Sequence, residues 1–155
     1  MGNRGNVRQE TISYNIGKLI ESKLLEIDRN LLFAIAFSEE LPNVSSICEK
    51  IAEESISDVA DLGKILLLNG ASPQICLNAT LSTLEFCHDK PEKVPYTAVG
   101  VVRNNINSKK RMAAFMKKTL EKPELLCCEG GMELLNGVYL KELRRTEELK
   151  AFLCG

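Results

Sequence analysis

The residues best suited to chemistry in this chain are its cysteines and its single histidine. Cys87 and His88 could combine with Cys127 and Cys128 into a Cys/His metal site, or His88 could activate a cysteine as a nucleophile. Two adjacent pairs fit poorly around one tetrahedral ion, and the sequence contains no CxxC pair. The more frequent outcome is a set of buried thiols that pack as small apolar side chains. The other cysteines are Cys48, Cys76 and Cys154.

Other catalytic motifs are missing from the sequence. It contains no GxxxxGK[ST] or GxGxxG phosphate-binding loop and no HExxH zinc motif. The chain starts with polar residues rather than a hydrophobic signal region, and no apolar run reaches the ~18 residues of a membrane span. We therefore expect a cytoplasmic protein with free thiols and no membrane partner.

The composition is that of an ordinary globular domain. The 155 residues are 45% apolar and 26% charged, and 20 basic against 21 acidic residues give a net charge of -1. This balance, together with an aromatic content of only 5%, disfavours nucleic acid as a partner. We expect one helical-bundle domain over residues 12–155 and a flexible tail over residues 1–11.

Apolar residues recur at helical spacing in four long segments. Steps of three and four residues predict helices at about 13–40, 46–69, 96–120 and 132–153. The second helix is expected to start at the capping box Ser46–Glu49 and to end at Gly70. Residues 73–87 fit either a short helix or an extended crossover. The pattern predicts an all-α fold, an antiparallel four-helix bundle with a crossover between the second and third helices.

Charge is distributed unevenly along the chain. Seven acidic residues and one basic residue, Lys50, lie between Glu39 and Asp61, whereas seven basic residues and no acid lie between Lys93 and Leu120. Solvated helix faces of opposite sign that attract each other are the simplest explanation. The functional alternative is a basic face for an acidic partner, or self-association between acidic and basic faces.

The layout of two helical pairs joined by a crossover resembles the ferritin-like bundles, especially the rubrerythrin-type proteins. The resemblance extends over about residues 12–153. It includes the stretch Ala52–Asp58 followed by Leu68–Pro73, and the closing stretch that begins with Tyr139–Arg145. In such bundles a Glu from each of two helices and a Glu-x-x-His from each of the other two hold two metal ions. The resemblance therefore implies a ferritin-like fold and a polar layer in the bundle core.

On this resemblance, the metal ligands would be carboxylates. The first segment would contribute Glu21 or Glu26, and the last segment Glu142. The second segment places its two ligand positions on one of two pairs, Ser55 with Asp58 or Glu54 with Ser57. An active di-metal protein, holding iron or manganese and acting on oxygen, peroxide or ferrous iron, would use Glu21, Glu54, Asp58 and Glu142.

Basic residues stand where this pattern requires ligands. Arg145 takes the place of the last histidine, and the third segment contains no glutamate but has Arg103 and Lys110 as its inward-leaning polar residues. A cation in the core opposes a divalent metal and attracts carboxylates such as Asp58 and Glu142. We therefore expect an ion-pair network in place of the metals, although such a network contributes little net stability.

Three functions follow from these patterns. The leading one is a ferritin-like bundle that lacks a complete di-metal site, holds no cofactor and binds or assembles with a protein partner, as a homodimer, rather than catalysing a reaction. The second is the iron or manganese carboxylate protein. The third is a thiol-based redox sensor that uses Cys87, Cys127 or Cys128.

Overall fold

The described part of the chain consists of helices. The computed structural model describes residues 3–70, 97–126 and 129–154, and none of these residues lies in a strand. The elements are α1 (Asn3–Ala36), α2 (Pro42–Leu68), α4 (Ala98–Leu120), the single turn α5 (Pro123–Leu126) and α6 (Gly131–Cys154). The predicted all-α class is confirmed. Residues 73–87, for which a short helix or a crossover was expected, lie outside the described residues.

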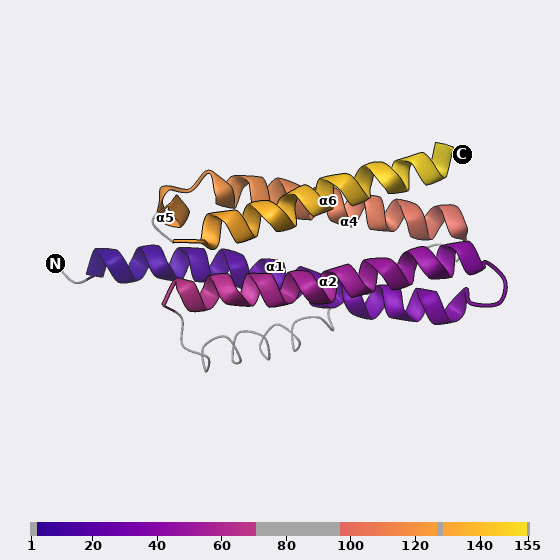
Figure 1. The fold of residues 1–155 in the computed structure, drawn as a ribbon, viewed down its shortest axis with the longest axis horizontal. Helices are drawn as coiled ribbons and strands as arrows, with labels where there is room; N and C mark the ends of the chain where they lie inside the picture. The colour runs from indigo at the N-terminus through magenta and orange to yellow at the C-terminus, as the bar shows by residue number, and fades with distance from the viewer. Residues whose placement is uncertain (1–2, 71–96, 127–128, 155) are drawn as a thin grey trace.

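The four long helices lie side by side in two layers, α1 with α2 and α4 with α6 (Figure 1). Packing is closest within each pair, α2 packs against α6, and α1 and α4 share the fewest contacts of these neighbours. Glu26 pairs with Lys109 and, one turn further along α1, Asn30 pairs with Asn105, one turn earlier on α4, so α1 and α4 run antiparallel. This looser junction between α1 and α4 leaves room for the pocket described below.

The start of α2 differs from the predicted capping box. The helix begins at Pro42, and its N-cap residue, Leu41, makes no side-chain cap bond. Proline suits the first helical position because the amide hydrogen that it lacks would have no partner there. The predicted end is confirmed, since Gly70 adopts a positive φ of 84° that terminates the helix. The first helix also differs, because α1 begins about ten residues before the expected start at residue 13.

The second pair of helices has well-defined ends. The Thr97 hydroxyl caps α4 by accepting a hydrogen bond from the Gly100 amide at 3.0 Å. Gly130, with a φ of 79°, lies directly before α6. A residue with a side chain would be strained in that conformation. The bounds of α4 and α6 agree with those predicted for the third and fourth helices to within two residues.

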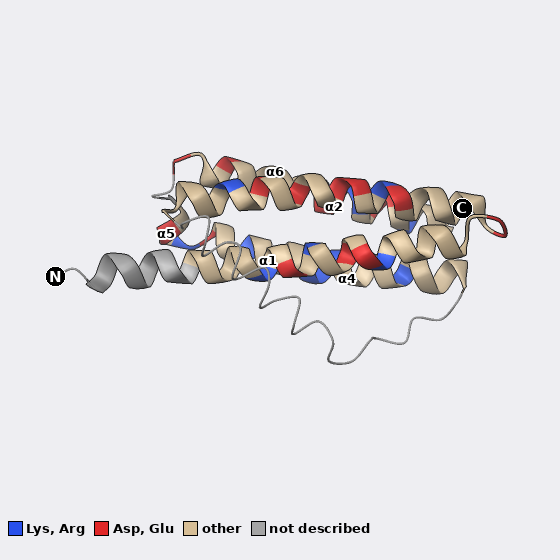
Figure 2. Ribbon diagram, turned by 90° about the horizontal axis from the view of Figure 1, so that it is seen from below, with Lys and Arg blue, Asp and Glu red and all other residues tan. Residues whose placement is uncertain are grey.

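The apolar core is interrupted at its middle. One end holds the largest group of buried apolar side chains, which includes Leu19, Leu62 and Leu135. Smaller groups around Val102 and Phe37 fill the other end. Figure 2 shows acidic and basic residues along the middle of the four long helices. Some of these charged side chains point inward, and they form the site described next.

Candidate functional site

Five charged side chains from all four long helices meet inside the bundle. We call Lys23, Glu26, Asp58, Lys109 and Glu142 the central ionic cluster; each of these side chains is at most 2% exposed. Lys23 Nζ lies 3.0 Å from Asp58 Oδ2 and also binds Glu142 Oε1. Lys109 Nζ lies 2.8 Å from Glu26 Oε1 and 3.1 Å from Glu142 Oε1. Both ammonium groups therefore bridge carboxylates from different helices.

Two further residues complete the surroundings of the cluster. Lys141 Nζ lies 2.5 Å from Asp58 Oδ1, and its side chain is 31% exposed. The Ser55 hydroxyl donates a hydrogen bond of 2.8 Å to Glu26 Oε1. With Lys141 included, three positive charges face the three negative charges of Glu26, Asp58 and Glu142. The five-residue cluster therefore has one excess negative charge when every member is ionised, and Lys141 balances it.

The surroundings keep members of the cluster ionised. Burial alone would lower the pKa of Lys23, but the charges of Glu26, Glu142 and Asp58 outweigh it and hold that pKa above its usual value of 10.5. Burial alone would raise the pKa of Glu26, but Lys109 and Lys23 outweigh it and hold that pKa below its usual value of 4.5. The two pKa values shift in opposite directions because the neighbouring opposite charges stabilise the charged form of each residue.

We expect the free energy of unfolding to fall at both pH extremes. Because the folded pKa of Glu26 is lowered, its stabilising contribution is complete above pH 4.5 and is lost as the pH falls through the folded pKa. Because the folded pKa of Lys23 is raised, its contribution is complete below pH 10.5 and is lost as the pH rises through the folded pKa. Urea titrations at successive pH values measure both limbs, and a flat acid limb would contradict the assigned Glu26 pairing.

An amide pair lies next to the cluster. Asn30 and Asn105 are both buried, and each donates its side-chain amide to the other's carbonyl oxygen, at 3.0 and 2.9 Å. Asn30 also donates to the Glu26 backbone carbonyl at 2.9 Å. A buried reciprocal pair is satisfied only in one register of α1 against α4, so it fixes how these helices align. Neither residue was predictable as buried from its type alone, since asparagine is mostly exposed.

The predicted metal ligands do not all converge. Asp58 and Glu142 lie in the central ionic cluster, whereas Glu21 is half-buried and pairs with Lys18 at 3.4 Å. Glu54 lies outside the cluster and accepts a hydrogen bond of 3.1 Å from Arg145 Nε. Burial opposes the ionisation of Glu54, but Arg145 outweighs that effect and lowers its pKa. Glu26, the predicted alternative to Glu21, is the carboxylate that α1 contributes to the cluster.

The predicted cations are not those of the cluster. An ion-pair network is present in the core, but Arg103 and Lys110 are exposed on α4, and the buried cation of that helix is Lys109. The buried face of α4 contains Val102, Ile106 and Met116, and Lys109 lies on this face three residues after Ile106. Arg145 is 17% exposed and pairs with Glu54 instead of Asp58. The expected network is thus confirmed, and its expected basic residues are wrong.

The cysteines are only partly described. Cys48 is buried, and burial raises the pKa of its thiol to about 11. A thiol with such a pKa is a poor nucleophile at neutral pH. Cys154 is exposed. Cys87, His88, Cys127 and Cys128, on which the thiol-sensor and Cys/His hypotheses depend, lie outside the described residues.

Searches of protein families, curated proteins and solved structures find no match to this chain. Its class therefore depends on the fold and the site, which define a helical bundle with a buried ionic cluster at its centre. Over residues 3–70, 97–126 and 129–154, no helix is both long enough and apolar enough to cross a membrane. The same residues contain no group of three or more His, Cys, Asp or Glu side chains placed to hold a metal ion.

Proposed function

We propose that the protein is a ferritin-like four-helix bundle that lacks a complete di-metal site and acts by assembly and binding rather than by catalysis. The observation that supports this proposal is the position of Lys23 and Lys109 among the core carboxylates. In di-metal bundles those inward carboxylates hold two metal ions. Here each carboxylate of the cluster already pairs with a buried ammonium group. A divalent ion would have to displace these fixed positive charges.

Metal analysis tests the non-catalytic part of the proposal. The full chain is purified without chelator, incubated with ferrous iron or Mn²⁺, desalted and analysed, beside a di-iron carboxylate protein as positive control. We expect no stoichiometric iron or manganese, because Lys23 and Lys109 repel the ion. Two ions per chain would overturn the proposal in favour of the iron or manganese carboxylate protein. No geometric observation in the described residues favours that alternative.

The outer face of α1 supports assembly with a second copy of the chain. Its exposed apolar side chains are Tyr14 (64% exposed), Leu25 (37%), Leu32 (67%) and Ile35 (72%), which follow one another at helical spacing with charged residues between them. A face of this kind commonly marks an interaction site. The charged residues that lie on the same face of α1, between these apolar side chains, are Lys18, Glu21 and Asp28.

The spacing along this face is self-complementary. Tyr14 and Lys18 are four residues apart, and so are Asp28 and Leu32. An antiparallel pairing of two α1 helices that places Tyr14 beside Leu32 of the copy therefore also places Lys18 beside Asp28. A two-fold axis repeats both contacts, as an isologous dimer requires. Charge and apolar complementarity thus favour a homodimer as the assembled form.

The wild-type chain should have twice its 17.2 kDa mass in light scattering after size exclusion. Leu32→Glu should convert it to a monomer because it introduces a charge at the centre of an apolar contact. Leu140→Glu on α6, where Leu140 is 54% exposed, is the matched control and should leave the dimer intact. Lys18→Asp alone should weaken the dimer, and adding Asp28→Lys should restore it. A monomeric wild type would contradict the dimer.

A further inference from the structure

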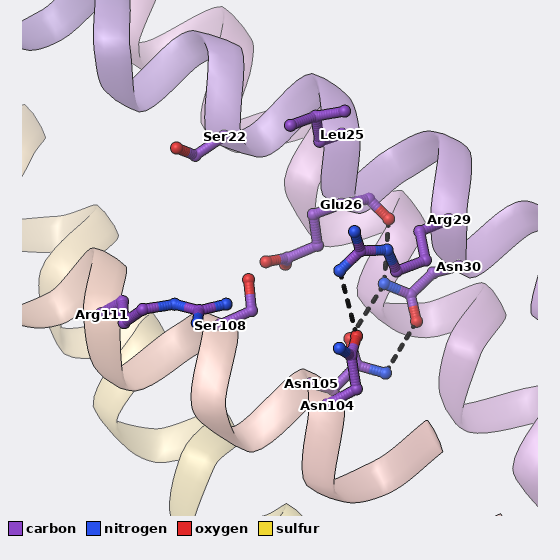
Figure 3. A pocket seen from close by; sticks show the side chains of 9 residues that line it. All are labelled: Ser22, Leu25, Glu26, Arg29, Asn30, Asn104, Asn105, Ser108 and Arg111. Carbon is purple, nitrogen blue, oxygen red and sulfur yellow. Dashed lines mark hydrogen bonds between the residues drawn. The ribbon is translucent and has the colours of Figure 1, made fainter. Parts of the chain in front are cut away.

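The pocket between α1 and α4 is lined mainly by polar side chains that interact with other parts of the chain (Figure 3). Arg29 donates a hydrogen bond of 3.1 Å to Asn104, and Asn30 and Asn105 form the reciprocal pair described above. Arg29 and Arg111 each have further interactions. The polar groups of this pocket therefore stabilise the junction between the two helices.

A groove between α4 and α6 has a different character. Its volume is about 480 Å³ and its surface is mainly apolar. The apolar lining comes from Ala113 and Ala114 on α4 and from Tyr139 and Leu143 on α6, and Leu143 is 40% exposed. A water molecule occupies about 30 Å³ in the liquid, so the groove has room for about 16 waters or for several apolar side chains. None of its lining residues comes from α1, so it is separate from the face proposed for the homodimer.

The charged residues of the groove are mainly basic. Lys110 and Lys117 flank the two alanines on α4, and Lys150 and Glu147 line the opposite wall on α6. Three lysines against one glutamate leave a net charge of two positive. Lys150 pairs with Glu147 at 3.0 Å, whereas neither Lys110 nor Lys117 has an ion pair within the described part of the chain. The excess positive charge therefore lies on α4.

The spacing of the two lysines on α4 indicates the kind of occupant. Lys110 and Lys117 are seven residues apart, which is almost two helical turns, so they lie on one face about 10.5 Å apart along the axis. Two acidic residues seven positions apart on a partner helix have the same separation. A fatty acid would also suit the apolar surface, but its single carboxylate would leave one lysine without a counter-ion.

The residues between the two lysines suit the apolar side of such a helix. Positions three and four after an acidic residue lie on the same helix face as that residue. Apolar side chains at these positions would meet Ala113 and Ala114, and small residues at a helix contact allow the two axes to approach closely. Binding of an amphipathic helix in a groove between two helices is a common mode of recognition.

We propose that the groove between α4 and α6 binds an amphipathic helix of a partner protein, in which two acidic residues seven positions apart pair with Lys110 and Lys117. Two apolar residues of this helix, three and four positions after the first acidic residue, pack in the groove. The partner is thus recognised by charge at two points and by apolar contact between them. This binding goes beyond the homodimer of the proposed function and uses a different face of the bundle.

Fluorescence anisotropy tests the binding with a labelled helical peptide of about 20 residues, long enough to form a helix. The peptide contains Glu-x-x-Leu-Leu-x-x-Glu in an alanine and glutamine background and is blocked at both ends. A second peptide has glutamine in place of both glutamates. We expect the full chain to bind the acidic peptide about tenfold more tightly, as two exposed ion pairs allow. Equal affinity would overturn the acidic partner, and no binding of the acidic peptide would overturn the groove as a docking site.

Variants locate the binding on α4. Lys110→Gln combined with Lys117→Gln should weaken binding of the acidic peptide about tenfold. Arg103→Gln combined with Lys118→Gln removes the same charge from exposed positions of α4 outside the groove and should leave the affinity unchanged. Circular dichroism checks the helix content of both variants. An equal loss in the two would show a general charge effect and overturn the assignment.

A third variant separates the apolar contact from the charge. Ala114→Arg adds a positive charge but places a large side chain in the groove, so it should weaken binding of the acidic peptide at least tenfold. Tighter binding by this variant would show that charge alone attracts the peptide and would overturn the groove. Sodium laurate at the concentration of the peptide should not displace it. Displacement would assign the groove to an anionic amphiphile instead of a helix.

Light scattering distinguishes a partner protein from a further copy of the chain. Glu21 and Asp28 on α1 are themselves seven residues apart, so α1 of another copy could occupy the groove. A wild-type mass above that of a dimer, reduced by Ala114→Arg, would show this occupant and overturn the separate partner. The peptide titration is repeated on the monomeric Leu32→Glu variant, because Leu32 does not line the groove. Unchanged affinity there supports the groove even if the homodimer is wrong, and lost affinity would overturn it.

Discussion

Lys23→Met should destabilise the fold by about 3–5 kcal/mol, the usual effect of removing one partner from a buried ionic network. Lys23 is fully buried and pairs with Asp58 and Glu142 as well as with Glu26. Methionine is similar in length and apolar, so packing is conserved while the carboxylates lose an ammonium group. Urea denaturation at neutral pH measures the change, which should shift the midpoint and leave the slope unaltered.

Lys64→Met on α2 is the matched control for that variant. The Lys64 side chain is 65% exposed, and its salt bridge with Asp61 spans 3.8 Å. Removing an exposed pair of this kind changes stability by about 0.5 kcal/mol or less. If Lys23→Met were as mild as Lys64→Met, Lys23 would not be the buried counter-ion of the cluster.

A fourfold apolar replacement should have the opposite effect. Combining Lys23→Met, Glu26→Leu, Lys109→Met and Glu142→Leu should leave the protein as stable as the wild type or more stable by about 1–4 kcal/mol. Three carboxylate oxygens of the wild-type cluster, Glu26 Oε2, Asp58 Oδ1 and Glu142 Oε2, accept no hydrogen bond among the described residues, although Asp58 Oδ1 has an ion pair with Lys141. A partly satisfied buried network is less favourable than well-packed apolar side chains.

The remaining polar groups near the cluster keep partners in this fourfold variant. Asp58 retains Lys141, and the Ser55 hydroxyl can turn to a backbone carbonyl of its own helix. The single variant Glu142→Leu is the control and should be destabilised, because it leaves Lys23 and Lys109 short of a counter-ion. Calorimetric melting of both variants checks the contrast. A fourfold variant less stable than Glu142→Leu would show that the network itself stabilises the fold.

The helices were predictable because their periodicity is strong and local. The α2 end at Gly70 and the α4 end before Pro123 follow directly from residue type. The predicted start of α2 was wrong because the sequence has two helix-start signals close together. The helix begins at the earlier one, Pro42, and not at the Ser46–Glu49 capping box. Proline fixes its own backbone and removes a donor, whereas a capping box contributes only hydrogen bonds.

The presence of an ionic cluster in the core was predictable, but the lysines that form it were not. A core ion-pair network was expected and is present, yet Lys23 and Lys109 were overlooked because a lysine within an apolar stripe is normally assigned to the solvent side. The choice of Lys109 over Lys110 depends on a rotation of about 100° per residue around α4. That rotation is set by packing between helices. The pocket could not be predicted at all, because it depends on the spacing between α1 and α4.

The division of charge between the two halves has a consequence for how the chain assembles. Within the cluster, α1 and α2 contribute one positive and two negative side chains, Lys23 with Glu26 and Asp58. The α4–α6 half contributes Glu142 and Lys109 to the cluster, and also Lys141, which pairs with Asp58 at its edge. Each hairpin alone would therefore enclose an uncompensated charge, negative in the first and positive in the second. Docking of the hairpins is thus steered by long-range attraction, and added salt should slow this step of folding more than it slows helix formation.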